Sequence, residues 1–227
     1  MVSRIFFKLF VISSVTGSLF FFNACNSALE AGSAAGIQGM DAASLSIDQY
    51  PVEEISQAES DGMVYMREEE KLARDVYKTL YTHWNIRVFN NIPRSEQQHM
   101  DAIKLLLDRY QLEDPVGNDS LGVFKNETLQ ELYNTLTTQG SVSLVEALKV
   151  GALIEEIDIL DLQRELDDDV DNQDITFVYE NLMKGSRNHL RAFVRNLSRQ
   201  GVEYVPQKLS EEQYLEIINS DWERGRR

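Results

Sequence analysis

The stretch MVYMREEEKLARDVYKTL, residues 63–80, decides the fold class of this chain. It contains no Pro or Gly, and its apolar residues recur at three- and four-residue spacings: Met63, Met66, Leu72, Val76 and Leu80. This is the period of an amphipathic helix with one side against a core. The pattern continues on both sides of the stretch and predicts one long helix over residues 53–84.

Three more long helices are expected further along the chain. The second, residues 93–110, begins with Pro93, whose fixed φ suits a first helical turn. The third, residues 143–166, opens with a capping box formed by Ser143 and Glu146. The fourth spans about residues 175–199, after an acidic run that closes the third.

The connection between the second and third helices is long. Residues 112–126 are rich in turn formers, and a short helix is expected at residues 127–139. Ser210 with Gln213 opens a last short helix near the C terminus. Because no segment of comparable length alternates with period two, a sheet is not expected. The sequence therefore predicts an all-α domain over residues 50–227, a four-helix bundle with a crossover segment.

The N-terminal region has the features of an export signal. Residues 1–24 carry Arg4 and Lys8, followed by an apolar run too short for a comfortable membrane span. Cys25 comes next and resembles the modified thiol of a bacterial lipobox. A lipoprotein lipidated at Cys25 is expected, in the periplasm or anchored to the outer membrane; a soluble exported protein and an uncleaved anchor are the alternatives. The Gly/Ala/Ser-rich residues 25–49 are expected to form a flexible tether.

Composition excludes several classes of protein. One Cys in 227 residues is too few for a disulfide scaffold, a structural zinc finger or a Cys-ligated iron–sulfur cluster. With 22 Lys and Arg against 37 Asp and Glu, the formal charge of -15 offers no basic field to nucleic acid. No nucleic-acid partner is expected.

Charged residues within the predicted helices indicate a metal site. Glu96 and His99, in SEQQH, stand at i and i+3 and therefore share one helix face, on the core side. Such a pair is a weak signal alone, but each other long helix also offers a ligand near its middle. The expected metal ligands are Glu70, Glu96, His99, Glu155, Asp158 and His189.

These residues also carry a resemblance to a known family. EKLARDVY at residues 70–77 resembles the first-helix pattern of rubrerythrins, E-x-x-A-R-x-x-Y, and Glu96 with His99 resembles the E-x-x-H of their second helix. Residues 155–158 resemble the carboxylate pair of the third, and His189 with Phe193 the end of the fourth.

A wider stretch, residues 63–209, is similar to the ferritin-like family known as domain of unknown function 2202. The similarity covers MREEEKLARDVY, SEQQHMDA, LVEALKVGALIEEIDILDL, YENLMKGSRNHLRAF and YVPQKLS. The resemblance implies a ferritin-like bundle with a site for iron, or alternatively manganese. It implies no settled activity.

One position departs from the ferritin-like pattern. The fourth helix of that pattern repeats E-x-x-H, yet the residue three before His189 is Ser186. Four carboxylates, Asp158 included, would still balance two divalent cations. The sequence leaves open a dinuclear site, a mononuclear site, and a buried polar network without metal.

Other candidate residues are expected to have different roles. Glu68, Glu69 and Glu156 neighbour the proposed ligands but point elsewhere, and are interpreted as a solvated acidic stripe. Tyr77 lies two turns beyond Glu70 and is either a core aromatic or a partner that could hydrogen-bond a ligand or carry a radical.

Two functions remain open at this point. The first is a redox enzyme, peroxidase- or ferroxidase-like, whose iron centre reacts with oxygen, peroxide or ferrous iron. Without a Cys-rich electron-transfer module, such an enzyme would need an external electron donor. The second is a non-catalytic metal-binding or structural envelope lipoprotein. A homo-oligomer is compatible with either function.

Overall fold

The computed structural model describes residues 47–223, and within them every regular element is helical. The elements are η2 (Ile47–Gln49), α1 (Gln57–Trp84), α2 (Arg87–Arg109), α3 (Glu127–Gly140), α4 (Leu144–Asp168), α5 (Gln173–Arg199) and α6 (Glu211–Asn219). The all-α prediction is confirmed for this part of the chain. The expected signal at residues 1–24, the lipidation site Cys25 and most of the tether lie outside the described residues.

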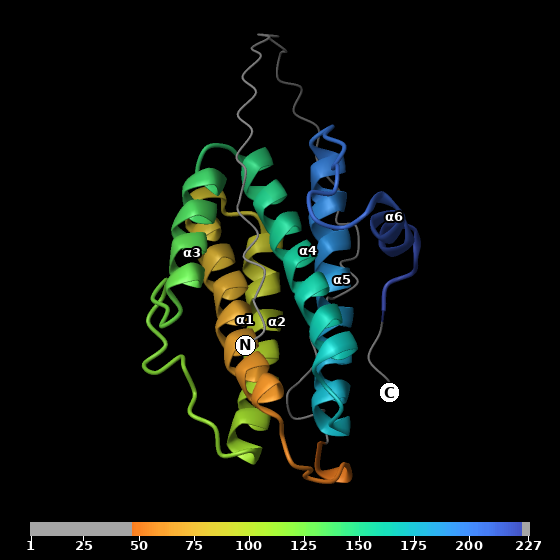
Figure 1. The fold of residues 1–227 in the computed structure, drawn as a ribbon. Coiled ribbons are helices and arrows are strands. Elements are labelled where there is room, and N and C mark those ends of the chain that lie inside the picture. Colours follow the sequence, from red (N-terminus) through yellow and green to blue (C-terminus); the bar gives the residue numbers. More distant parts are fainter. Residues whose placement is uncertain (1–46, 224–227) are drawn as a thin grey trace, which may run out of the picture. The chain divides into compact units, whose positions relative to one another are not determined.

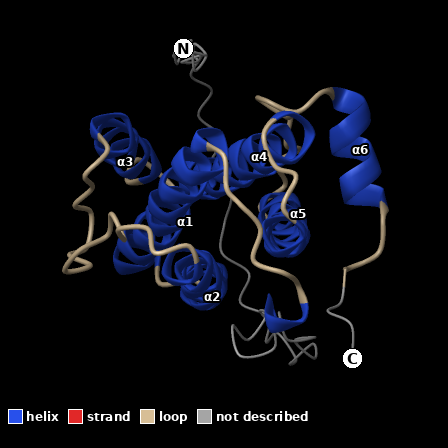
Figure 2. Ribbon diagram, turned by 60° about the horizontal axis from the view of Figure 1, so that its bottom comes forward, coloured by secondary structure: helices blue, strands red, loops and turns tan. Residues whose placement is uncertain are grey.

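Four long helices pack side by side, with α1 against α2 and α4, and α5 against the same two helices (Figure 2). The closest pairs are α1 with α2 and α4 with α5, each joined by a short connection. Helix α2 ends at the opposite end of the bundle from the start of α4, and the segment between them, which includes α3, spans that length (Figure 1). This is the expected crossover; α3 packs on α1 and α4, and α6 packs on α5.

Two helix starts differ from the predicted positions. Helix α1 begins at Gln57 rather than residue 53, because Ser56 and Glu59 form a capping box there. Helix α2 begins at Arg87, so Pro93 lies inside it instead of opening it. Asn85 adopts a left-handed conformation with φ of 48°, which reverses the chain within two residues. Pro93 then leaves one carbonyl of the preceding turn without its helical donor.

The chain is folded slightly further upstream than expected. Ile47 is buried and η2 contacts α5, so the last three residues of the predicted tether belong to the domain. Tyr50 packs on Phe177 of α5 with ring centroids 5.3 Å apart. Among the described residues, no helix combines the length and apolar character needed to cross a membrane.

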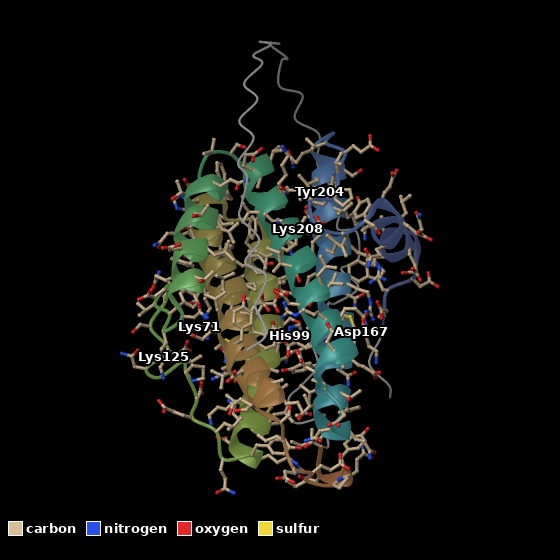
Figure 3. All side chains as sticks on the ribbon, viewed as in Figure 1. Lys71, His99, Lys125, Asp167, Tyr204 and Lys208 are labelled. Carbon is tan, nitrogen blue, oxygen red and sulfur yellow. The ribbon has the colours of Figure 1, made fainter. Side chains whose placement is uncertain are left out.

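The crossover segment is fastened to α1 by charged side chains. Arg67 makes two hydrogen bonds to Asp114, and Lys71 donates to the carbonyl of Ser120 (2.8 Å). Glu68 accepts from the backbone N–H groups of Lys125 (2.6 Å) and Asn126 (3.0 Å). Lys71 and Lys125 lie on this side of the bundle (Figure 3). The expectation that Glu68 is solvated is therefore wrong, because its carboxylate caps backbone donors far away in the sequence.

Glu156 was also expected to be solvated, and that prediction is wrong for the same reason. It is fully buried and accepts hydrogen bonds from the Tyr204 hydroxyl and from the backbone N–H groups of residues 207–209. Tyr204 and Lys208 lie beside α4 and α5 (Figure 3). Glu156 thus fixes the segment that leads to α6 against α4.

Candidate metal centre

Five of the six predicted ligands converge near the middle of the bundle. Each of the four long helices contributes, and all five side chains are at most 1% exposed: Glu70 from α1, Glu96 and His99 from α2, Glu155 from α4 and His189 from α5. His99 lies within the bundle rather than on its outer face (Figure 3). The helical period explains the convergence, because each residue occupies the inward side of its helix.

Glu96 is the central residue of the cluster. Its Oε2 lies 2.8 Å from Nδ1 of His99, and its Oε1 lies 2.9 Å from Nδ1 of His189. The two imidazole rings stack with centroids 5.5 Å apart. One carboxylate therefore faces two imidazoles, as a ligand shared by two metal ions would.

The outer carboxylates complete two sets of donors. Oε2 of Glu70 lies 3.1 Å from Nδ1 of His99, and Oε2 of Glu155 lies 3.5 Å from Nδ1 of His189. The sets are Glu70, Glu96 and His99, and Glu96, Glu155 and His189; within each, one ligand atom per residue lies within 4.8 Å of the others. These two sets, which share Glu96, are called the dinuclear cluster below, a name that refers to the two donor sets and not to bound ions.

Electrostatics within the dinuclear cluster depends on burial and mutual pairing. Burial would raise the pKa of Glu96, but the charges of His189 and His99 outweigh it and lower this pKa to about 2. Burial raises the pKa of Glu155 to about 7 and that of Glu70 above its ordinary value. Burial would lower the pKa of His189, yet Glu96 and Glu155 raise it to about 10. Without metal, protonated imidazoles therefore pair with carboxylates of the cluster.

Tyr77 combines the two roles considered for it. Its ring packs in the core against Phe193 and Phe89, with centroids 5.1 and 6.2 Å away. Its hydroxyl donates a 2.6 Å hydrogen bond to Oε1 of Glu155. Burial, with Glu155 nearby, raises the pKa of Tyr77 well above its ordinary value, so the phenol keeps its proton. Tyr77 leaves Oε2 of Glu155 as the oxygen that faces His189.

Asp158 is buried beside the dinuclear cluster but belongs to neither donor set. Among the described residues, no hydrogen-bond donor reaches either of its oxygens. Burial, together with the charges of Glu69, Glu70 and Glu155, raises the pKa of Asp158 well above its ordinary value. Asp158 lies one turn beyond Glu155 on α4. It stays a predicted ligand, but its carboxyl group is part of neither donor set.

Glu69 was interpreted as part of a solvated stripe, and that interpretation is wrong. It is 2% exposed, and the carboxyl group of Asp161 on α4 lies against it. Burial and Asp161 raise the pKa of Glu69 well above its ordinary value. The helix-face argument failed because α4 covers the side of α1 that Glu69 occupies.

Two small residues on α5 adjoin the cluster. Ser186, one turn before His189, is buried and donates to the carbonyl of Leu182 (3.3 Å). A Cβ added at Gly185 would clash with Nε2 and Cε1 of His99. The sequence did not single out Gly185, and no spacing signals it, because the close approach is between α5 and α2.

The dinuclear cluster has an approximate internal symmetry. The α1–α2 pair supplies Glu70 with Glu96 and His99, and the α4–α5 pair supplies Glu155 with Ser186 and His189. Ser186 and His189 have the same i, i+3 spacing as Glu96 and His99. The α5 half lacks the carboxylate that Glu96 provides in the α2 half. Asp158, also on α4, is buried beside the cluster but belongs to neither donor set.

Comparisons with known proteins agree with this architecture. Residues 59–221 match the family model described as Uncharacterized protein domain (DUF2202). The chain is 57% identical over 179 residues to Uncharacterized protein MJ0754 of Methanocaldococcus jannaschii, an alignment that covers 79% of this chain and 96% of that protein.

A solved structure is also similar, described as the crystal structure of hypothetical protein MJ0754 from Methanococcus jannaschii DSM 2661. It matches with a TM-score of 0.75 at 57% identity, over 76% of this chain and 98% of that chain. Residues 59–221, which match the family model, include all six predicted ligands and nearly all of the two closely packed helix pairs. The chain belongs to the DUF2202 family.

Proposed function

We propose that this protein is a ferritin-like metal-binding protein whose dinuclear cluster holds two iron ions and supports redox chemistry with oxygen, peroxide or ferrous iron. One observation carries the proposal: the Glu96 carboxylate faces Nδ1 of both His99 and His189, at 2.8 and 2.9 Å. Four inward-facing helices with a shared carboxylate are the arrangement of carboxylate-bridged metal sites in helical bundles.

The donor chemistry fits the proposed metal. Oxygen and imidazole ligands suit iron and manganese, and the cluster has no thiolate. With neutral imidazoles, Glu70, Glu96, Glu155 and Asp158 contribute four negative charges, which match two divalent cations. Oε1 of Glu70 and both oxygens of Asp158 have no hydrogen-bond donor among the described residues. Buried carboxylate oxygens without partners are costly unless they are protonated or bind a cation.

The protein's own residues would order and protect such a centre. Bound iron would supply one-electron chemistry toward a small oxidant. Glu96 would hold both halves of the cluster, and Tyr77 would fix the orientation of Glu155 through its hydrogen bond. The aromatic rings of Tyr77, Phe89 and Phe193 would limit water beside Glu155.

The remaining parts of the proposal concern the cellular context. An export signal at residues 1–24 and lipid attachment at Cys25 would place the domain outside the cytoplasm, beside a membrane. A redox activity would then need an external electron donor, because the chain carries one Cys and no electron-transfer module of that type.

Metal analysis of the purified chain tests the proposal. After anaerobic loading with ferrous iron and removal of excess metal, we expect about two iron ions per chain by mass spectrometry. His99→Ala and His189→Ala should each lose metal, whereas His83→Ala, on the exposed end of α1, should retain it. Full retention in both cluster variants would contradict the site. If iron binds but optical spectra do not change on mixing with oxygen or peroxide, the non-catalytic alternative holds.

A further inference from the structure

The acidic side chains do not end at the dinuclear cluster. On α4, Glu155 is followed by Asp158, Asp161 and Glu165, a spacing that keeps them near one side of the helix. That side is covered by α1, since a Cβ at Gly62 of α1 would clash with the Glu165 carboxylate. A line of carboxylates therefore runs from the cluster along the α1–α4 interface.

Each member of this line neighbours the next. Asp158 lies close to Glu69 and Glu70, whose charges act on it most strongly after burial. Glu69 in turn lies against the carboxyl group of Asp161. The side chain of Asp161 is 23% exposed, so the line reaches the surface there, where Arg164 pairs with it at 3.1 Å.

The interior of the line is unlike an ordinary ion-pair network. Glu69 and Asp158 are at most 2% exposed, and among the described residues no N–H donor reaches any of their four oxygens; the carboxyl group of Asp161 lies against Glu69. By contrast, the equally buried Glu68 and Glu156 each accept several hydrogen bonds from backbone N–H groups. Two neighbouring buried carboxyl groups without N–H donors, at the interface of α1 and α4, offer oxygens that a cation would satisfy.

We propose that Asp161, Glu69 and Asp158 form the access route by which a divalent transition-metal cation reaches the buried dinuclear cluster. The inference rests on the proposed function, because the route leads to that cluster. Asp161 attracts the hydrated cation at the surface, Glu69 receives it as water is lost, and Asp158 passes it to Glu70. Carboxylates of one sign of charge in a low-dielectric interface concentrate the field and accelerate association of a cation.

The rate of metal uptake, compared with the amount of metal bound at equilibrium, distinguishes residues of an access route from metal ligands. The probe is Co²⁺, whose visible absorption changes when carboxylate and imidazole ligands replace water, and which oxygen does not oxidise under these conditions. The full chain, Glu69→Gln and Asp161→Asn are mixed with Co²⁺ in a stopped-flow instrument, and the amount bound at equilibrium is measured separately. Matched controls remove one charge at exposed positions: Glu180→Gln on α5 and Asp167→Asn on α4.

We expect uptake by Glu69→Gln and Asp161→Asn to slow by about tenfold or more, with the equilibrium stoichiometry unchanged. Asp161→Glu, which keeps the charge, should restore the rate, and both controls should match the unmodified chain. Equal uptake rates in all variants would overturn the route. Loss of one equivalent in Glu69→Gln would also overturn it, by making Glu69 a ligand. If the unmodified chain binds no Co²⁺ or iron, the proposed function fails and the route fails with it.

Discussion

The Tyr77 hydroxyl donates a 2.6 Å hydrogen bond to Oε1 of Glu155, and this bond links the aromatic core to the dinuclear cluster. The relationship joins α1 to α4 across the bundle, with partners 78 positions apart. Since the phenol keeps its proton, it acts only as a donor to the carboxylate. Tyr77 therefore sets which oxygen of Glu155 is free to face His189.

Tyr77→Phe should raise the pKa of Glu155 further above its value of about 7. Burial already raises this pKa, and the hydrogen bond from Tyr77 is one of the contacts that lower it. Loss of a donor to a buried carboxylate should also cost about 1–3 kcal/mol of stability in metal-free protein. Carboxyl NMR titration and denaturant unfolding measure the two effects. Tyr81→Phe, on the same helix but partly exposed, is the control; an unchanged Glu155 titration in Tyr77→Phe would contradict the assignment.

The stability of the metal-free protein should fall as pH rises from about 6.5 toward 10. The pKa of His189 is 6.5 in its ordinary state and about 10 in the folded chain, so the folded state holds an additional proton between these values. Its stabilising contribution is complete below pH 6.5 and is lost as pH rises through the folded pKa. Urea unfolding at several pH values in the presence of a chelator tests this sign.

With metal bound, stability should no longer fall as pH rises, because metal replaces the protons on the imidazoles. Metal affinity should rise with pH over the same window, and binding should release protons that a weakly buffered titration detects. His83→Gln leaves the cluster intact and should keep both behaviours. A metal-free stability that increases between pH 7 and 9 would show that the imidazoles are not protonated as inferred.

The features of the fold that depend on helical periodicity could be predicted from the sequence. The four long helices and the crossover follow from apolar spacing, and the inward positions of Glu70, Glu96, His99, Glu155 and His189 follow from the same periods. Each of these inferences needs only the residues of one helix. Capping by Ser210 and Gln213 was predictable for the same reason, and the structure confirms it.

The errors occurred where two distant segments meet. Glu68 and Glu156 resemble surface acids in the sequence, but their acceptor oxygens cap backbone N–H groups 51 or more positions away. Pro93 marks a helix start only when the residues before it are not already helical. Here the chain reverses at the left-handed Asn85, so α2 begins at Arg87, before Pro93. Periodicity within one helix carries no information about such partners.

Gly185→Ala should disturb the cluster more than its size suggests. The added Cβ would clash with Nε2 of His99, so the imidazole must move away from Glu70 and Glu96 or α5 must shift. Overpacking of this kind costs about 1–3 kcal/mol, and metal affinity should fall with it. Thermal unfolding and metal content are the measurements. Ser186→Ala, which removes one hydroxyl bonded to the Leu182 carbonyl, should leave metal content unchanged; equal metal binding in Gly185→Ala would show that His99 tolerates the shift.

Ser186→Glu should strengthen metal binding by the α5 half of the dinuclear cluster. Ser186 occupies, one turn before His189, the position that Glu96 occupies one turn before His99. A glutamate there adds a fourth anionic ligand inside the cluster and removes the dependence on Asp158. Because the site is buried, the larger side chain should destabilise the metal-free protein. Bound metal should then raise the melting temperature by more than it does in the unmodified chain, since a ligand that binds the folded state more tightly stabilises it more. Ser186→Gln has the same size without the charge and should show the destabilisation but not the larger metal response. If both variants respond alike to metal, position 186 does not face the metal.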